Sequence, residues 1–292
     1  MPPAPITNRS KPNSVALETT LLVHGIPRDV VHDVATQLFD AVASAGAHPT
    51  LVGVVAGKPT VGMTSEELQS MLREASVEKV NRANLGVAMA RGRWGATTVS
   101  TTIELSHAAG VEVFATGGIG GVHRDYATHL DISADLGAIA AHPVAVVTSG
   151  CKNILDVRAT REALETLGVP VVGYKTDTFP AFYQRSSGIA IDASFDSEHE
   201  LAAFIKFELA RSGRGVVVCN PIPTDAEIPL DTWNTWLSTA FGRVSGRGRD
   251  STPALLAAVH EVSAGATVTA NIALARSNTE IAGRIAASMR RT

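Results

Sequence analysis

Residues 113–156 read VFATGGIGGVHRDYATHLDISADLGAIAAHPVAVVTSGCKNILD. Apolar, β-branched runs at 111–115 and 144–148 stand near the two ends of this stretch and predict buried strands. Between them Ser133 precedes the apolar segment 135–141, which predicts a helix with Ser133 as its N-cap. A strand, a helix and a second strand in this order indicate one unit of a layered α/β sheet.

The same alternation extends over most of the chain. On the N-terminal side we predict a strand over 15–23, a helix over 28–45, a hairpin of 50–56 with 60–63, a helix begun by a capping box at 64–67, a connector at 79–81 and a helix over 95–109. On the C-terminal side we predict helices over 160–167, 197–212, 231–241, 251–262 and 268–290, strands over 169–174, 189–195 and 215–219, and a loop over 243–250. The pattern predicts an α/β fold with three α/β/α layers, a largely parallel central sheet and a single domain over 15–292, preceded by a flexible, proline-rich segment over 1–14.

Charge and composition exclude several classes of partner. The 292 residues carry a net charge of −3 and contain no long basic tract, which argues against a duplex nucleic acid partner. No apolar run approaches the roughly 18 residues of a membrane span, and residues 1–14 lack the apolar segment of a secretory signal. Cys151 and Cys219 lie far apart and form neither a disulfide framework nor a zinc pattern. We therefore predict a cytoplasmic protein with no nucleic acid or membrane partner.

Three polar features follow predicted strands, and in parallel sheets ligands bind at the carboxyl ends of the strands. These features are the glycine cluster 116–121, Lys152 and Asn220. A lysine at an apolar strand end loses hydration, which favours its neutral amine, and a neutral amine attacks an aldehyde to form an imine. Lys152 is therefore a candidate nucleophile. The alternative is a solvated lysine in a surface loop.

Glu18 interrupts the apolar strand predicted over 15–23. A carboxylate buried without a partner is costly, so a buried Glu18 needs a partner or takes up a proton. A carboxyl group that stays protonated near neutral pH is a proton donor, which makes Glu18 a candidate general acid. The alternative is an exposed glutamate on an edge strand.

Other residues suit an anion or a hard cation. Free N–H groups at the start of the helix that follows Ser133 could hold an oxyanion such as phosphate. Asp131, just outside that helix, could bind Mg²⁺ or Mn²⁺ with water as most of the other ligands. The alternative is that Asp131 and Asp135 only favour the helix dipole. His123, after the glycine cluster, and Lys79 would both suit a phosphate.

The glycine cluster does not complete a dinucleotide fingerprint, because His123 stands where the third glycine belongs. A P-loop and a G-x-S-x-G nucleophile motif are also missing from the sequence. A candidate amine, a candidate acid, a candidate metal carboxylate and several anion donors together suit carbonyl chemistry on a phosphorylated sugar.

The sequence resembles the pseudouridine-5′-phosphate glycosidase family, which includes indigoidine synthase A-like proteins. The resemblance covers residues 15–285 and lies in six motifs, which are ALETTLLVHGIP (16–27), GATTVSTT (95–102), ATGGIGGVHR (115–124), HLDISADL (129–136), SGCKNILD (149–156) and CNPIP (219–223). It implies an α/β/α enzyme that cleaves the C–C glycosidic bond of pseudouridine 5′-phosphate to uracil and ribose 5-phosphate. It also implies one Mn²⁺ per subunit and a homotrimer.

Position by position, the resemblance implies roles for the candidate residues. Lys152 is the nucleophile that attacks C1′ of the ring-opened sugar, Glu18 is the proton donor, and Asp131 is the metal ligand. The substrate-binding positions that it implies are Lys79, Val99, Thr116, His123, Ser133, Ala134, Asp135 and Asn271.

Departures from the family pattern leave the acceptor open. ALETT, with Thr19 after Glu18, and SGCKN, with Cys151 and Asn153 flanking Lys152, differ from the residues that we expect there. RVSGRGRD (243–250) is a further departure. An alternative within the family is a C-glycosynthase that joins ribose 5-phosphate to an aromatic acceptor. An alternative of another class is a non-catalytic sensor of sugar phosphates.

Overall fold

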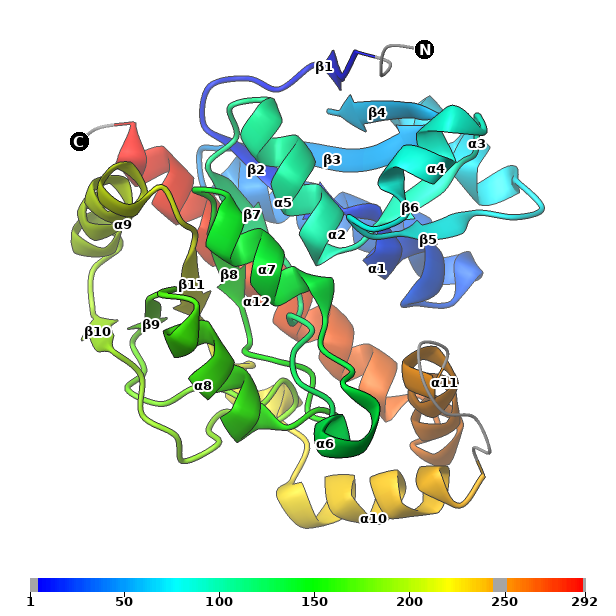
Figure 1. The fold of residues 1–292 in the computed structure, drawn as a ribbon, viewed down its shortest axis with the longest axis vertical. Coiled ribbons are helices and arrows are strands. Elements are labelled where there is room, and N and C mark those ends of the chain that lie inside the picture. The colour runs from blue at the N-terminus through cyan, green and yellow to red at the C-terminus, as the bar shows by residue number, and fades with distance from the viewer. Residues whose placement is uncertain (1–4, 244–250, 291–292) are drawn as a thin grey trace.

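The computed structural model describes residues 5–243 and 251–290 and confirms the predicted α/β architecture (Figure 1). Its strands are β1 (Thr7–Asn8), β2 (Ser14–Glu18), β3 (His48–Val55), β4 (Lys58–Val61), β5 (Glu78–Val80), β6 (Gly95–Thr97), β7 (Val113–Ala115), β8 (Ala145–Thr148), β9 (Val171–Tyr174), β10 (Ala193–Phe195) and β11 (Val216–Cys219). Its α-helices are α1 (Thr19–His24), α2 (Val31–Ser44), α3 (Ser65–Arg73), α4 (Leu85–Ala90), α5 (Val99–Ala108), α6 (Tyr126–His129), α7 (Ala134–Ala141), α8 (Val157–Thr166), α9 (Glu198–Ser212), α10 (Leu230–Phe241), α11 (Ser251–Val262) and α12 (Ala266–Met289). Short 3₁₀ helices occupy Arg28–Val30 and Thr224–Ala226.

These strands form one sheet in the order β1-β4-β3-β2-β7-β8-β11-β9-β10, with β6 paired to β3 and β5 paired to β6. Strands β2, β7, β8 and β11 are parallel neighbours, whereas β3 pairs antiparallel with β4 and β6. The carboxyl ends of the four parallel strands therefore meet at one edge of the sheet. Helices α6, α10 and α11 lie beyond that edge (Figure 1).

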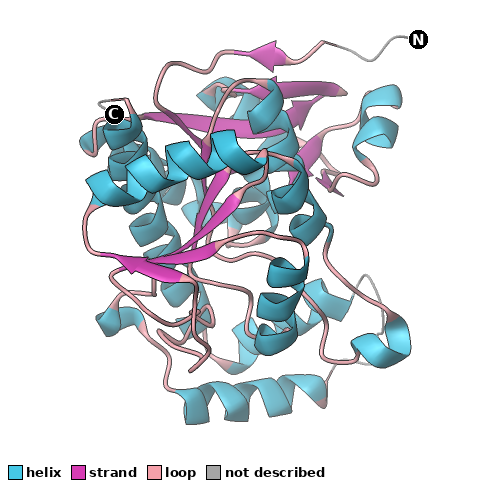
Figure 2. Ribbon diagram, turned by 60° about the vertical axis from the view of Figure 1, so that its left-hand side comes forward, coloured by secondary structure: helices cyan, strands magenta, loops and turns pink. Residues whose placement is uncertain are grey.

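Helices cover both faces of the sheet (Figure 2). Successive strand residues point to opposite faces and enter two separate apolar cores. Val15 and Leu17 belong to the core under α2, α9 and α12, whereas Ala16 and Phe114 belong to the core under α5, α7 and α8. Phe114 is fully buried, and burying a side chain of this size stabilises the fold by roughly 1.5–3 kcal/mol.

The predicted strand over 15–23 is wrong in its second half, because β2 ends at Glu18 and α1 begins at Thr19. The Thr19 hydroxyl donates to the Val52 carbonyl (3.0 Å) and accepts the Thr97 N–H (2.8 Å). These tertiary hydrogen bonds turn the chain out of the sheet, although its β-branched residues favour a strand. Glu18 thus becomes the last residue of its strand instead of an interior one.

The threonine-rich segment 95–109 is also divided. Residues Gly95–Thr97 form β6, and the predicted helix begins only at Val99 as α5. Thr97 Oγ1 donates to the Val52 carbonyl at 2.7 Å, and Thr102 Oγ1 donates to Thr97 Oγ1 at 3.0 Å. These buried hydroxyls therefore join neighbouring elements of the protein. The predicted connector at 79–81 likewise overlaps a strand, β5.

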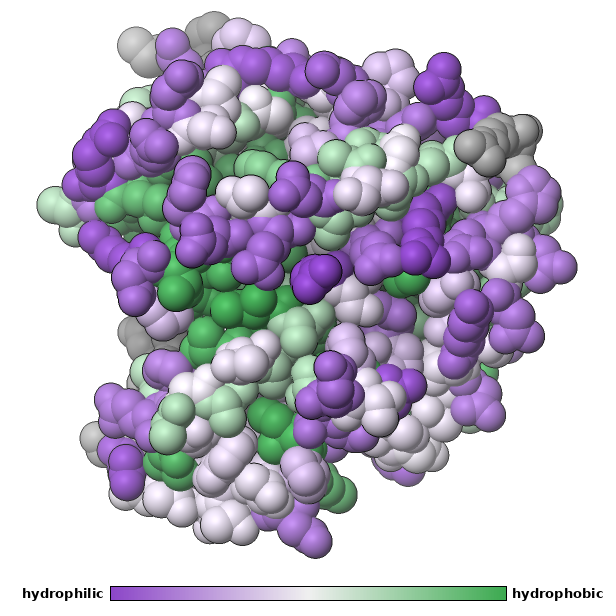
Figure 3. Space-filling view, turned by 180° about the vertical axis from the view of Figure 1, so that it is seen from behind, coloured by the Kyte–Doolittle hydropathy of each residue, from purple (hydrophilic) through white to green (hydrophobic). Residues whose placement is uncertain are grey.

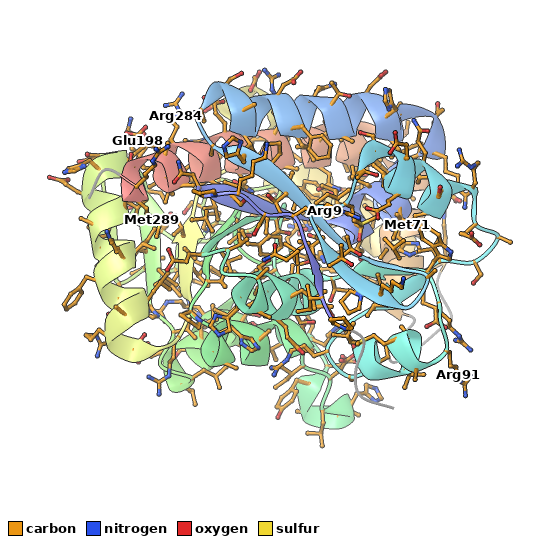
Figure 4. The ribbon with its side chains drawn as sticks, turned by 90° about the horizontal axis from the view of Figure 1, so that it is seen from above. Arg9, Met71, Arg91, Glu198, Arg284 and Met289 are labelled. Atoms are coloured by element: carbon orange, nitrogen blue, oxygen red, sulfur yellow. The ribbon has the colours of Figure 1, made fainter. Side chains whose placement is uncertain are left out.

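Part of the N-terminal segment pairs with the sheet, and the flexibility predicted over 1–14 stays a prediction. Strand β1 pairs in parallel with β4, and Arg9 forms an ion pair with Glu67 of α3 (2.8 Å). Glu67 also completes the predicted capping box with Thr64. Figure 4 shows Arg9 beside this part of the sheet.

At the other end of the chain, Arg284 of α12 contacts Glu198 of α9 (3.2 Å), as the same figure shows.

Two further predictions concern membrane-spanning helices and the loop over 243–250. None of the helices in the described ranges combines the length and the apolar character that crossing a bilayer requires. The loop predicted over 243–250 falls almost wholly outside the described residues, of which Arg243 is the last before the gap.

Candidate active site

Four strand ends bring the predicted reactive residues to one edge of the sheet. Glu18 is the last residue of β2, and Thr116 directly follows β7. Lys152 lies in the loop that begins with Ser149 after β8, and Asn220 directly follows β11. Because β2, β7, β8 and β11 are parallel neighbours, residues that are distant in the sequence lie side by side.

Glu18 is partly buried. The Thr116 hydroxyl donates a hydrogen bond of 2.5 Å to Glu18 Oε1. Burial raises the pKa of the Glu18 carboxyl above its ordinary value, and the positive charge of Lys152 is the strongest influence in the opposite direction. Lys79 also lowers this pKa, whereas Asp135 raises it. The side chain is thus surrounded by the residues that the sequence predicted to act with it.

The Lys152 loop is held by backbone hydrogen bonds to the glycine cluster. The Lys152 N–H donates to the Ile119 carbonyl (3.1 Å), and the Ile119 N–H donates to the Gly150 carbonyl (3.0 Å). Gly150 has φ of +81°, and a Cβ there would collide with the Pro180 carbonyl oxygen, so only glycine fits. Lys152 itself is partly exposed.

Cys151, beside Lys152, points into the apolar core instead of the site. Its side chain is fully buried, and this burial raises the pKa of the thiol to about 12. The thiol therefore stays protonated near neutral pH and contributes no reactive group. The departure from the family pattern at this position is a packing change.

Asp135 binds two backbone N–H groups of the site. Its Oδ1 accepts from Ser100 at the start of α5 (2.9 Å), and its Oδ2 accepts from Gly120 (2.8 Å). Ser133 caps α7 as predicted, through a hydrogen bond of 3.2 Å from the Asp135 N–H. The Asp135 carboxylate thus ties the glycine cluster to α5, and its contact with a substrate stays a prediction.

We expect Asp135→Asn to lower the free energy of unfolding by about 1–3 kcal/mol. The side chain is buried, and an amide NH₂ in place of one oxygen would face a backbone N–H group that has lost its acceptor. Urea unfolding of the purified variant measures the change. Asp131→Asn is the matched control, because Asp131 is partly exposed, and an equal loss there would contradict the assignment.

Asp131 and His123 form a second group at the far end of the glycine cluster from Thr116. His123 Nε2 lies 3.5 Å from Asp131 Oδ2, and the His123 N–H donates to the Asp131 carbonyl at 3.1 Å. Within residues 5–243 and 251–290 no set of three or more His, Cys, Asp and Glu side chains is arranged to hold a metal ion. One carboxylate and one imidazole are donors that suit a hard divalent ion with water as most of its other ligands, and Mn²⁺ at this position stays a prediction.

The other predicted positions lie on elements that border the site. Val99 is the buried first residue of α5, and exposed Lys79 of β5 acts electrostatically on Glu18. A Cβ on Gly117 would lie 3.1 Å from Oδ1 of Asn271, which places this α12 side chain against the glycine cluster. Ala134 is the first residue of α7, directly after its cap.

Comparison with known proteins identifies the family. Residues 6–288 match the family described as indigoidine synthase A like protein. The chain belongs to this family. Curated relatives named pseudouridine-5′-phosphate glycosidase include one from Nocardioides sp., 43% identical over 93% of this chain and 90% of its own length. Another, from Paracoccus denitrificans, is 44% identical over 94% of this chain and 92% of its own.

Solved members of the family have the same fold. An indigoidine synthase A-like protein from Thermotoga maritima superposes with a TM-score of 0.91 at 35% identity, over 99% of this chain and 97% of that one. The prealnumycin C-glycosynthase AlnA, solved in complex with ribulose 5-phosphate, superposes with a TM-score of 0.88 at 33% identity, over 95% and 92%.

Sequence reasoning missed residues that hold the strand ends of this chain together. Asn278 of α12 is fully buried and hydrogen-bonds to the Thr116 carbonyl (2.8 Å) and to Ser149 Oγ (3.1 Å). Phe182 adopts a φ of +57°, unusual for a bulky residue, and its N–H donates to the Ser149 carbonyl (2.8 Å). The signal for Asn278 was a polar residue four positions from Leu274 and from Ala282 on an apolar helix face.

Proposed function

We propose that this protein cleaves the C–C glycosidic bond of pseudouridine 5′-phosphate with water to give uracil and ribose 5-phosphate, reversibly. The observation that carries the proposal is that the half-buried acid Glu18 ends β2 and Lys152 follows β8, on the two strands that flank β7, with the charge of Lys152 acting on the Glu18 carboxyl. Full-length relatives at 43% and 44% identity with this glycosidase name support the same reaction.

The chemistry requires both groups because a carbon leaving group is poor. The Lys152 amine forms a bond to C1′ while the C1′–O4′ bond breaks and Glu18 gives its proton to O4′. The Glu18 carboxylate then takes a proton from the lysine nitrogen. Glu18 then gives this proton to C5 of uracil as the nitrogen lone pair breaks the C1′–C5 bond, which leaves a protonated imine between Lys152 and C1′. Water hydrolyses this protonated imine to ribose 5-phosphate, and the extra proton on the lysine nitrogen returns to the Glu18 carboxylate, which restores the amine and the acid.

The residues around Glu18 support its role as the proton donor in these steps. A carboxyl group whose pKa is raised by burial holds a proton at higher pH than an exposed glutamate does. The Thr116 hydroxyl donates to Oε1, so the second oxygen remains to carry the proton.

Lys79 and His123 are proposed to bind the phosphate of the substrate. Ser133, Ala134 and Val99 are proposed to contact the sugar through backbone groups at two helix starts.

We propose that Asp131 holds one Mn²⁺ ion, with His123 beside it. A bound divalent ion supplies positive charge that binds and orients an anionic substrate. Removal of metal with EDTA should lower uracil release, and Mn²⁺ should restore it. Asp131→Asn should need a higher Mn²⁺ concentration for half-maximal activity, and metal titration followed by uracil release measures the shift. A variant with the wild-type Mn²⁺ dependence would refute this ligand.

The reaction is tested by incubating the protein with Mn²⁺ and pseudouridine 5′-phosphate and following uracil by chromatography. The folded wild-type protein should release one uracil for each ribose 5-phosphate formed. Borohydride added during turnover should attach the pentose phosphate covalently to Lys152, which peptide mapping locates. Absence of uracil from folded, metal-loaded protein would overturn the proposal.

A C-glycosynthase is the second candidate, and the similarity to AlnA at 33% identity is the observation that favours it. The two functions share the imine at Lys152 and differ in the acceptor that attacks it. Offering ribose 5-phosphate with either uracil or a polycyclic phenol separates them. We expect product with uracil, whereas product with the phenol alone would favour the synthase.

We also propose a homotrimer in the cytoplasm. Figure 3, which views the molecule from behind, shows apolar side chains gathered in a recess that polar side chains border. In addition, a groove of about 280 Å³ between α2 and α3 is lined in part by Val31, Phe39, Leu68 and Leu72. Such surfaces suit contact with further copies of the chain. Two buried free thiols fit a reducing compartment. Sedimentation equilibrium should give a mass of three chains.

A further inference from the structure

Helix α12 carries an asparagine where its pattern calls for an apolar residue. Its buried face consists mainly of alanine, leucine and isoleucine, and it packs against strands β2, β7 and β8 and against helix α2. Asn278 lies in the middle of that face with no exposed surface. A buried side-chain amide is costly unless its polar atoms have partners, so the partners of Asn278 indicate why it is there.

The Asn278 amide is fully bonded, and its partners belong to other elements. Nδ2 donates to the Thr116 carbonyl (2.8 Å), with a longer contact to the Gly117 carbonyl (3.3 Å), and to Ser149 Oγ (3.1 Å). Oδ1 accepts from Nδ2 of Asn220 at 2.9 Å. Ser149 Oγ donates in turn to the Asn220 carbonyl at 2.9 Å, which closes the network.

These partners are the first residues after three adjacent strands. Thr116 follows β7, Ser149 follows β8 and Asn220 follows β11. One amide therefore sets the relative positions of three carboxyl ends. Two of these ends carry the proposed chemistry, because Thr116 donates to Glu18 and Ser149 begins the loop that carries Lys152.

We propose that Asn278 is a positioning residue that fixes the spacing between the acid Glu18 and the amine Lys152. It does so through hydrogen bonds to Thr116, which contacts Glu18, and to Ser149, which begins the loop that carries Lys152. The inference rests on the proposed function, since it assigns a purpose to that spacing. Asn278 needs no contact with the substrate for this role. Misplacement of reacting groups by about 1 Å can cost on the order of 100-fold in rate, so a small shift of either loop is sufficient.

The test compares Asn278→Leu with a matched control, Thr279→Val. Leucine has the same branching and the same number of heavy atoms as asparagine, and it removes every hydrogen bond that residue 278 makes to the strand ends. Thr279 is the next residue of the same helix and is also buried, but its hydroxyl donates to the Ala275 carbonyl of α12 itself (2.7 Å). The control therefore removes a buried polar group from α12 without touching the site.

We expect kcat for uracil release to fall about 100-fold in Asn278→Leu, with little change in KM, and to stay near the wild-type value in Thr279→Val. Hydrogen exchange followed by mass spectrometry gives a readout that does not depend on activity. Peptides that cover residues 115–122 and 148–153 should exchange faster in Asn278→Leu alone.

The pH profile supplies a readout that a loss of stability alone would not change. Lys152, Lys79, Asp135 and the Thr116 hydroxyl act on Glu18, and the Thr116 hydrogen bond lowers the pKa of this carboxyl. If Thr116 moves away in Asn278→Leu, that pKa rises further. The alkaline limb of kcat that reports Glu18 should then shift to higher pH, and in Thr279→Val it should not.

Each outcome has a defined meaning. If wild-type protein releases no uracil and traps no ribose 5-phosphate on borohydride, the proposed function fails. If wild type is active and Asn278→Leu keeps its kcat, or loses activity only in proportion to its folded fraction, the positioning role is refuted. Should the leucine variant not fold, Asn278→Ser decides instead, since serine is polar but too short to bridge the strand ends, and a wild-type kcat there refutes the role equally.

Discussion

Lys152→Arg should abolish uracil release, with a loss on the order of 10⁴-fold or more, the scale on which enzymes lose activity with their covalent nucleophile. Arginine keeps the positive charge but its guanidinium does not lose a proton, so it forms no imine. Uracil release measured by chromatography gives the rate. Borohydride with ribose 5-phosphate should label the wild-type protein and leave Lys152→Arg unlabelled.

The same variant separates an enzyme from a sensor. A sugar-phosphate sensor needs only a cation at residue 152, so its ribose 5-phosphate binding should survive the arginine, and borohydride should label neither protein. Lys206→Arg, an exposed position on α9, is the matched control and should retain both turnover and labelling. Turnover that persists in Lys152→Arg would remove the imine from the mechanism.

Glu18→Gln should lower kcat roughly 100- to 10,000-fold, which is the contribution typical of a general acid. Glutamine keeps the size of the side chain and can remain bonded to Thr116, but it has no proton to give. The wild-type kcat should fall on the alkaline side as pH rises through the raised pKa of Glu18, where the acid loses its proton. Stopped-time uracil assays across pH measure this limb, and the variant should lack it.

Stability should change in the opposite direction to activity. Burial raises the pKa of Glu18, so between its unfolded and folded pKa values the folded state binds more protons, and stability falls as pH rises through this window. Glu18→Gln removes this titration. We expect the variant to have a higher free energy of unfolding than wild type at neutral pH and no such advantage below the unfolded carboxyl pKa. Urea unfolding at two pH values tests this, and a variant that is less stable at neutral pH would contradict it.

Much of the fold followed from local patterns. The apolar runs around the glycine cluster became β7 and β8, and Ser133 caps α7, because both patterns depend on residues that are neighbours in sequence. The segment after Glu18 did not follow its pattern. Its β-branched residues favour a strand, but the Thr19 hydroxyl donates to the Val52 carbonyl and accepts the Thr97 N–H, and these contacts with residues far along the chain accompany its turn into a helix.

The candidate site divides in the same way. Lys152 and Glu18 were found from the mismatch between a charged side chain and its apolar surroundings, which is visible in one segment. Asn278 has the same mismatch, but its meaning depends on three strand ends that approach it from elsewhere in the chain. A single sequence contains no information on such partners, so the asparagine could be noticed there but not explained.

The order of these residues along the chain has a consequence for protein synthesis. The ribosome makes Glu18, Thr116 and Lys152 before it reaches α12, and domains begin to fold from the N-terminal side while the chain grows. The side chain that joins their strand ends, Asn278, is therefore made after all three of them. A growing chain that has not yet reached residue 278 would contain the amine and the acid without their common support.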